Sequence, residues 1–345
     1  MAPPDDTVPA SAEIVRLAEQ ALGDLAVVAI GRNEGERLER CLRSVVDTAA
    51  VTVYVDSGST DDSLDIARRC GAEIVELDTS IPFSAARARN AGYRAALAAR
   101  PDLRWIQFVD GDCEVQSGWL HAARRFLAEN PKVAAVCGRR RERFPERSIY
   151  NELCDIEWDV SPGVAKYCGG DVMIRGEALV QVDGYRDSLI AGEEPELCVR
   201  LRRAGWQIYV LDRDMTLHDA AMTRFPQWWR RVKRSGWAYA AGAHLHGRSP
   251  ERHWVWQSAQ AWIWVALPLA ALLAALPLAG WWAFAILLIY PLQFLRLFMK
   301  LTGTPRRRWL SAYAFTVGRF AEFAGQLRYL WDVATGRSAR LIEYK

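Results

Sequence analysis

The chain has 345 residues and a formal net charge of +3, enough length for one large domain or two smaller ones with a substantial core. Residues 296–345 hold ten Lys or Arg and three Asp or Glu, a net charge of +7, which leaves −4 for the remainder. This distribution argues against nucleic acid as a partner, because a nucleic-acid-binding protein places its basic surface on the folded domain. Seven scattered cysteines without a CxxC pair argue against a zinc site or a disulfide framework and indicate a reducing compartment.

Residues 1–23 are predicted to be a disordered lead-in, and residues 24–223 an α/β catalytic domain. The opening MAPPDDTVPAS has neither the basic nor the apolar part of a signal peptide. Apolar runs then alternate with helical patterns, which indicates a parallel sheet covered on both faces; the runs lie at 26–30, 51–55, 72–77, 103–109 and 132–138. Ligands of such sheets bind beyond the carboxyl ends of the strands. Asp56 and Asp110 each follow a strand directly and should face one crevice.

The segment FVDGDCEV (108–115) gathers three acidic residues within five positions. One interpretation is a solvated turn, since Asp-Gly is a common turn dipeptide. The other is a divalent cation site, because hard cations require oxygen ligands. Carboxylates at i and i+2 share a side of an extended segment, so Asp110 and Asp112 can converge on one ion. Mg²⁺ favours one or two protein carboxylates together with phosphate oxygens, which suits this sequence better than a calcium loop.

Motifs of other enzyme classes are missing from the sequence. The first strand is followed by GRNEG rather than GxGxxG, which disfavours a dinucleotide oxidoreductase. The chain also lacks a Walker GxxxxGK[ST] motif, a GxSxG elbow and an HExxH motif. The sequence therefore offers no motif that would support an NTPase, a hydrolase of the GxSxG type or a zincin.

Residues 251–300 are predicted to form a transmembrane helical hairpin. No charged residue occurs from Trp254 to Leu295, a run of 42 positions with a break near Pro277–Gly280. One bilayer span takes about 20 helical residues, so two spans fit. Both flanks are basic and the tip is uncharged, which predicts a multi-pass protein of the cell (inner) membrane with its catalytic domain in the cytoplasm. A buried hairpin of a soluble protein is the alternative.

Two further segments are predicted to lie at the membrane interface. Residues 224–250 interleave bulky aromatic residues with Arg and Lys. Residues 301–345 form a basic amphipathic tail with apolar residues at helical spacing over 310–330. The charges within this tail favour an in-plane helix over a third span, which is the alternative.

Five segments occur in an order that resembles the family 2 glycosyltransferases over roughly residues 24–240: AVVAIGRNEGERLERCLRSV, VDSGSTDDS, FVDGDCEV, CGGDVMIRGEAL and AGEEPELCVRLRRAGW. The resemblance implies the GT-A fold, a Rossmann-related, mostly parallel sheet with helices on both faces that binds a nucleotide sugar. Two positions depart from the family pattern. Ser57 replaces the second acid of VDDGSTD, and Glu194 stands where the GEDxxL helix has Asp.

The resemblance also implies roles for individual residues. The residues that would bind the donor are Asp56, Arg89, Asn90, Asp110 and Asp112. Asp56 would hydrogen-bond the base, and Asp110 and Asp112 would bind the diphosphate through Mn²⁺ or Mg²⁺. Glu194 would be the catalytic base, with Glu193 beside it.

General chemistry supports these roles. A departing nucleoside diphosphate gains negative charge that a cation offsets. The attacking acceptor hydroxyl must lose its proton to a positioned carboxylate. Pro195 favours a first helical turn, whose positive end would help keep Glu194 ionised, whereas Glu193 acts in the opposite direction.

Further positions complete the predicted site. His218, in LHDA, is a third candidate metal ligand, with an ordinary loop histidine as the alternative. Gly169 and Gly170 of CGGD are predicted to line the acceptor side. Gln227 and Arg230, in QWWRR, resemble the QxxRW motif of processive synthases, although Arg occupies the position of its Trp. Interfacial packing explains these aromatic residues equally well.

The sequence therefore predicts a metal-dependent, inverting glycosyltransferase of cell envelope polysaccharide synthesis. It would move a sugar from a UDP- or GDP-linked donor to a membrane-held acceptor, either a lipid-linked saccharide or a polyprenyl phosphate. One alternative is a processive polysaccharide synthase, for which two spans are too few to build a channel alone. The other is a catalytically silent membrane scaffold, against which the acidic residues Asp110, Asp112 and Glu194 argue.

Overall fold

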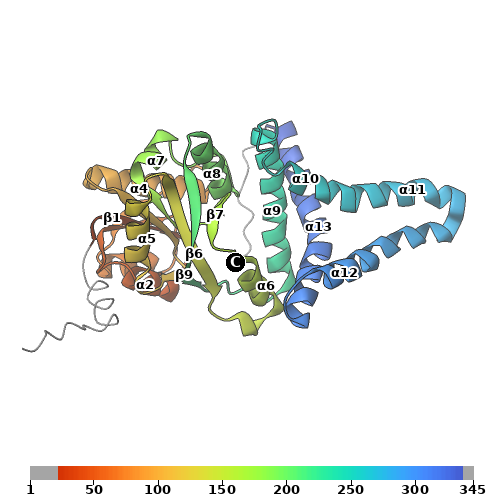
Figure 1. Ribbon diagram of the computed structural model, residues 1–345, viewed down its shortest axis with the longest axis horizontal. Coiled ribbons are helices and arrows are strands. Elements are labelled where there is room, and N and C mark those ends of the chain that lie inside the picture. Colours follow the sequence, from red (N-terminus) through yellow and green to blue (C-terminus); the bar gives the residue numbers. More distant parts are fainter. Residues whose placement is uncertain (1–21, 337–345) are drawn as a thin grey trace, which may run out of the picture.

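The computed structural model describes residues 22–336, which form a sheet domain, a layer of two long helices and a projecting apolar hairpin (Figure 1). The predicted lead-in lies outside this range except for residues 22 and 23, which belong to the first strand. Residues 337–345 of the predicted tail also lie outside it.

The sheet domain alternates strands and helices. Its strands are β1 (Leu22–Gly31), β2 (Ala49–Asp56), β3 (Glu73–Glu76), β4 (Trp105–Asp110), β5 (Cys113–Val115), β6 (Val133–Glu142), β7 (Gly163–Ala165), β8 (Val172–Arg175) and β9 (Gln207–His218). Its helices are α2 (Glu36–Arg43), α3 (Ser63–Arg69), α4 (Ala85–Ala99), α5 (Trp119–Glu129), the short 3₁₀ helix η1 (Pro145–Arg147), α6 (Ile149–Glu157), α7 (Gly176–Gln181) and α8 (Glu193–Arg203).

The strands form one sheet in the order β3-β2-β1-β4-β8-β6-β9-β5, with β7 paired to β9. The neighbours β3, β2, β1 and β4 are parallel, as the sequence predicts. The second half is mixed, because β8 runs antiparallel to both β4 and β6. The α/β class is thus confirmed, and the parallel arrangement is limited to the first half of the sheet and the β6–β9 pair.

Buried strands bring the predicted acidic residues to one edge of the sheet. Asp56 lies opposite Gly31 of β1, and Asp110 lies opposite the preceding residue, Ile30. The two aspartates therefore end the strands on either side of β1, offset by one residue. Helix α4 lies close to these strands because it has glycine at position 92. A Cβ on Gly92 would lie 2.3 Å from Cγ1 of Val28. This close approach brings the polar residues of α4 to the same edge.

A helical module follows the sheet domain. Its elements are α9 (Phe225–His246), α10 (Val255–Ala261), the π-helical turn η2 (Trp262–Ala266), α11 (Leu267–Ala279), the 3₁₀ helix η3 (Gly280–Leu288), α12 (Ile289–Lys300) and α13 (Pro305–Ala334). Helices α9 and α13 lie side by side between the sheet domain and the hairpin (Figure 1). Glycines allow this contact: a Cβ on Gly325 would lie 2.0 Å from the carbonyl oxygen of Lys233.

The stretch Val255–Lys300 is, by length and composition, the one helical stretch among residues 22–336 that could cross a membrane. It is not straight. The chain turns back at Gly280, whose φ is +53°, so α11 and α12 form two arms that project from the helical layer (Figure 1). Very little of its most apolar part is buried within the protein.

Candidate active site

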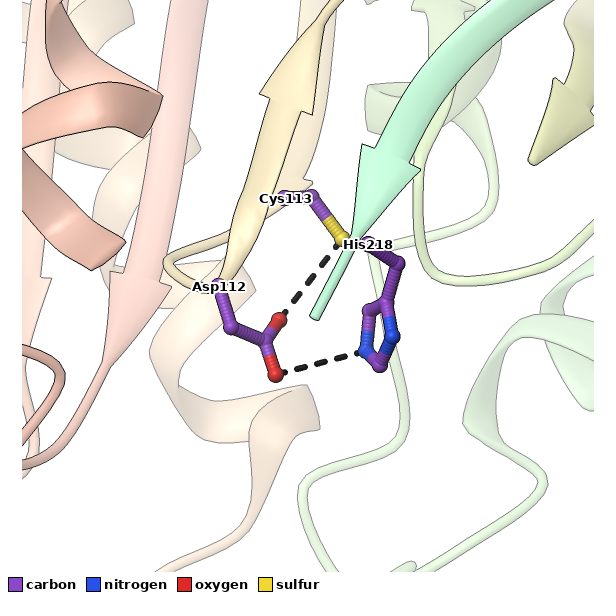
Figure 2. A group of neighbouring side chains, drawn as sticks. All are labelled: Asp112, Cys113 and His218. Carbon is purple, nitrogen blue, oxygen red and sulfur yellow. Dashed lines mark hydrogen bonds and ion pairs between the residues drawn. The ribbon is translucent and has the colours of Figure 1, made fainter. Parts of the chain in front are cut away.

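Of the two aspartates of the DGD sequence, Asp110 ends β4 and Asp112 lies in the turn that leads into β5. Strand β5 pairs antiparallel with β9, which places Cys113 opposite His218. The pairing brings the neighbouring Asp112 to the same histidine, with Oδ2 of Asp112 3.3 Å from Nε2 of His218 (Figure 2). His218 is buried at the end of β9 and is therefore not a loop histidine.

Glu142, at the end of β6, contacts the other nitrogen of the His218 ring, with Oε2 3.5 Å from Nδ1. The Glu142 carboxylate accepts hydrogen bonds from the backbone N–H of Ala220 and from the side chain of Asn151, both at 3.1 Å. A metal-binding histidine usually binds the metal through one ring nitrogen and contacts a carboxylate with the other. Glu142 was not predicted, because only the β6–β9 pairing joins it to a residue 76 positions away.

Two groups of side chains here have the spacing of metal ligands. The ligand atoms of Asp112, Cys113 and His218 lie within 4.8 Å of one another, and so do those of Asp110, Cys113 and Asp171. Burial raises the pKa of the Cys113 thiol well above its usual value, which disfavours the thiolate form that metals bind. The remaining donors are carboxylate oxygens and one imidazole nitrogen, a set that suits Mn²⁺ or Mg²⁺. The residues present therefore fit such a cation.

Arg89, from α4, joins the acidic turn to the start of α8. Its side chain is almost fully buried and its guanidinium lies 2.8 Å from Asp110, 3.0 Å from Glu193 and 2.6 Å from Glu194. Three carboxylates predicted from two separate sequence segments thus meet at one guanidinium group. Arg89 leaves these carboxylates only partly neutralised, because one positive charge faces three acidic groups.

Glu194 is the predicted base, and its surroundings change its protonation. Burial raises its pKa to about 7, and the charges of Glu193 and Asp110 act in the same direction. Arg89 and a backbone hydrogen bond at the helix start act to lower it. Burial outweighs the stabilisation expected from the positive helix end. A carboxylate with a pKa near 7 accepts a proton more readily than an exposed one and still ionises at neutral pH.

Gly170 lies against these charged groups. A Cβ at this position would be 2.5 Å from Nη2 of Arg89 and 3.1 Å from Oδ2 of Asp110. A side chain here would push into the cluster, so the glycine allows Arg89, Asp110 and Glu194 to pack this closely around it. The adjacent Gly169 has open space around it, since a Cβ there would have nothing within 4 Å.

Arg140 and Asp171 form a second ion pair that the sequence did not reveal. Asp171 is fully buried and accepts hydrogen bonds from the hydroxyl of Thr216 at 2.6 Å and from the backbone N–H of Asp110 at 3.0 Å. Arg140 lies 2.8 Å from Asp171 and 3.6 Å from Asp110, and its guanidinium covers the ring of Trp158. The pair fixes the backbone at the end of β4. In the sequence, only the aspartate of the CGGD segment hinted at this ion pair.

Asp56 and Asn90 lie near the cluster but have their own partners. The Asp56 carboxylate accepts from the backbone N–H groups of Gly58 and Ser59 and from the hydroxyl of Tyr54. Asn90 is buried, and its amide bonds to the backbone of Tyr185 and to the side chain of Asp187. Asn90 therefore fixes the segment before α8 instead of facing the acidic turn.

Gln227 and Arg230 lie on the first turns of α9, and the hydrogen-bond partners described for them do not belong to the charged cluster. The side-chain oxygen of Gln227 accepts from the backbone N–H groups of Thr223 and Arg224 and so caps the helix. Nε of Arg230 bonds to the carbonyl of Pro226. Arg230 also lines an open apolar depression of about 510 Å³, together with Phe225, Pro226 and Trp229.

The fold and the site can be compared with known proteins. A solved mannosyltransferase from Pyrobaculum calidifontis, in complex with GDP-Man and Mn²⁺, superposes with a TM-score of 0.59 and 20% sequence identity, covering 93% of each chain. The chain thus has the fold of a GT-A glycosyltransferase. Residues 26–162 match the glycosyl transferase family 2 profile.

Two curated relatives share parts of the sequence. A TPR repeat-containing protein of Synechococcus elongatus is 32% identical over 134 residues, which cover 39% of this chain and 31% of that protein. The pre-mycofactocin glycosyltransferase of Mycobacterium tuberculosis is 24% identical over 241 residues, covering 66% of this chain and 49% of that protein. The chain therefore matches at most about half the length of these relatives.

Proposed function

We propose that this protein is an inverting glycosyltransferase that uses a nucleotide-sugar donor and a divalent cation at a membrane surface. The observation that carries the proposal is the charge balance of the charged cluster. Four carboxylates, those of Asp110, Asp171, Glu193 and Glu194, lie around two guanidinium groups, those of Arg89 and Arg140, and a fifth, that of Asp112, contacts His218. A surplus of buried negative charge is costly unless a cation is recruited.

Asp112, His218 and Asp110 are the residues we assign to the cation. A bound Mn²⁺ or Mg²⁺ supplies positive charge that neutralises the departing nucleoside diphosphate. The protein's own contribution is to hold its donors in place. Glu142 orients the His218 ring, and Asp171 fixes the backbone of Asp110.

Asp56 is assigned to the nucleotide base. A carboxylate has about four lone-pair sites, and the hydrogen bonds to Asp56 from Tyr54, Gly58 and Ser59 use three of them. One site on Oδ1 is left to accept an N–H of the base. A uracil and a guanine both offer such a donor, so UDP- and GDP-linked sugars are both candidates. Asn90 is assigned an indirect role, through the segment 185–187.

Glu194 is assigned as the base that takes the acceptor proton. Arg89 holds its carboxylate, Gly170 allows the two to pack closely, and the adjacent Gly169 has open space around it on the proposed acceptor side. Attack from the face opposite the nucleotide inverts the anomeric centre. Glu193, buried against Arg89, shares the positive charge and thereby limits how strongly Arg89 lowers the pKa of Glu194.

The apolar hairpin is proposed to insert into a membrane as two spans. Its tip residues Leu278, Trp281 and Trp282 have exposed fractions of 89%, 85% and 82%, a surface that water does not favour. Helix α13 runs across the base of the hairpin and exposes Trp309 and Trp331, residues suited to the membrane interface (Figure 1).

This placement puts the active site beside the bilayer and favours a lipid-borne acceptor, a lipid-linked saccharide or a polyprenyl phosphate. The open depression at Phe225 and Arg230 is the acceptor-side surface we propose, with Gln227 as its helix cap. The catalytic domain would face the cytoplasm, where nucleotide sugars are made.

The proposal is tested with the full chain in lipid nanodiscs against a panel of UDP- and GDP-linked sugars. Nucleotide release should require Mn²⁺ or Mg²⁺, stop with a chelator and return when the metal is restored. Glu194→Gln should abolish transfer to acceptor while nucleotide binding persists. The absence of both turnover and nucleotide binding across the panel would contradict the proposal.

A further inference from the structure

The corner between α9 and α10, residues 246–254, contacts the helix that carries Glu193 and Glu194 (Figure 1). It connects α9, the helix next to the sheet domain, to α10, where the apolar stretch begins. Two independent contacts, at Trp254 and at His246, join this corner to α8. Neither residue belongs to the charged cluster.

The indole of Trp254 lies between two glycines from different elements. A Cβ on Gly192, which precedes α8, would lie 2.7 Å from Cζ3 of Trp254, and a Cβ on Gly242 of α9 would lie 2.6 Å from its Cε3. His253 stacks on the indole at 4.4 Å, and the ring of Tyr239 meets it edge-on at 5.1 Å. The indole therefore fits only because both positions lack side chains. Gly192 is also held at φ +77°, where a side chain would be strained.

The backbone of the corner is itself in an unfavourable conformation. Arg252 and Trp254 have φ values of +45° and +56°, a region that side-chain-bearing residues rarely adopt. Such conformations persist only where the surroundings hold them, and they concentrate at functional sites. Here the surroundings are the contacts of Trp254 with α8 and α9.

A second contact reaches α8 one turn further along. Nε2 of His246, at the end of α9, lies 3.0 Å from Oε1 of Glu196, and both side chains are buried. Glu196 also pairs with Arg186 and Arg200, so its carboxylate cannot turn away without breaking several bonds. His246 and Trp254 thus hold the two sides of the first turn of α8, from Gly192 to Glu196.

We propose that Trp254 and His246 are positioning residues that set the first turn of α8, and with it the Glu194 carboxylate, against Arg89 and Gly170. The inference rests on the proposed function for its consequence in catalysis. Trp254 immediately precedes α10. The insertion of the apolar hairpin into the bilayer and the position of the Glu194 carboxylate therefore depend on the same residue. A shift of about 1 Å in a catalytic group is enough to lower a rate by about 100-fold.

The test compares Trp254→Ala with Trp256→Ala, a control two residues away whose indole is 62% exposed. His246→Ala is the second variant. All are full-length chains in lipid nanodiscs. One readout is backbone hydrogen exchange of the peptide covering 190–197. The others are turnover and the KM for the donor, together with binding of UDP or GDP with Mn²⁺.

The expected result is faster exchange at 190–197 and a 10- to 100-fold fall in turnover for Trp254→Ala, with a smaller change of the same kind for His246→Ala. Nucleotide binding and the donor KM should stay within about twofold of the control. Unchanged exchange in both variants, or a parallel loss of nucleotide binding, would overturn the proposal. If the wild-type chain shows neither turnover nor nucleotide binding, the proposed function fails, and hydrogen exchange alone still decides whether the corner holds α8.

Discussion

At the scale of residues, the site is governed by how few positive charges face its carboxylates. Arg89 contacts Asp110, Glu193 and Glu194 at once, and Arg140 is shared between Asp171 and Asp110. Buried carboxylates that share a counter-ion disfavour simultaneous ionisation. Burial is the main cause of the raised pKa of Glu194, and the nearby charges of Glu193 and Asp110 add to it.

Transfer is expected to depend on pH through Glu194. Its pKa is raised from 4.5 to about 7, and only the ionised form can act as a base. Turnover should therefore fall tenfold for each unit of pH below about 7, and level off above it. A plot of turnover against pH measures this limb. A limb near the usual glutamate pKa, or none at all, would show that Glu194 is not the group that titrates.

Two adjacent glycines provide a matched test of the crowded site. Gly170→Ala places a methyl group 2.5 Å from Nη2 of Arg89, so transfer should fall by at least tenfold. Gly169→Ala meets no protein atom within 4 Å, so it should leave the charged cluster intact and lower turnover less than Gly170→Ala does. Steady-state kinetics of the two variants make the comparison. Equal turnover in both would mean that the close packing of Gly170 against Arg89 does not matter for transfer.

At the scale of elements, the close contact of α9 and α13 joins the sheet domain to the hairpin. Small residues allow the two backbones to approach, as in many helix pairs at membranes. A Cβ on Gly236 would lie 2.1 Å from the carbonyl oxygen of Glu322, and the ring of Trp237 meets that of Tyr329 edge-on. The contact fixes α13 across the base of the hairpin.

A pair of alanine substitutions tests this contact. Gly325→Ala would place its methyl 2.0 Å from a backbone oxygen and should destabilise the protein by about 1–3 kcal/mol. Gly318→Ala makes only an ordinary contact at 3.5 Å with Val232 and should be neutral or slightly stabilising. Thermal unfolding in nanodiscs distinguishes them. Identical midpoints would show that the helices are not held this closely.

The first half of the sheet was predictable because its strands contain short apolar runs, and β2 and β4 end in aspartate. The sequence also placed Arg89, Asp110, Gly170 and Glu194 in one site through separate motifs, and the structure brings these residues together. The mixed second half was not predictable. Strands β8 and β9 acquire their direction from partners far away in the chain.

The same cause hid several site contacts. Glu142 meets His218, and Arg140 meets Asp171, only after β6 has paired with its neighbours. No local pattern in the sequence encodes these pairings. The roles of the site residues themselves stay predictions until they are tested.

At the scale of the whole molecule, three layers succeed one another: sheet domain, paired helices and hairpin (Figure 1). The charge-free run predicted the hairpin, and Gly280 provides its turn. The helical layer separates the sheet domain, with its charged cluster, from the apolar arms. The proposed lipid-borne acceptor would have to pass this layer to reach the site.

Membrane attachment through the hairpin is tested by liposome flotation. The full chain should float with anionic vesicles at both low and high salt, because insertion of apolar arms is insensitive to screening. Replacing residues 262–292 by a Gly-Ser linker should leave binding that is lost at high salt, since only basic and interfacial residues remain. Salt-resistant flotation of the linker variant would contradict insertion of the hairpin.

The cation site is tested most directly by Mn²⁺ binding in the presence of UDP or GDP, followed by electron paramagnetic resonance. Asp112→Asn removes a proposed ligand, and Asp183→Asn makes the same change at a side chain that is 98% exposed. We expect Asp112→Asn to weaken Mn²⁺ binding by at least tenfold, while Asp183→Asn binds as the wild type does. Equal Mn²⁺ affinity in all three proteins would contradict a cation held at Asp112.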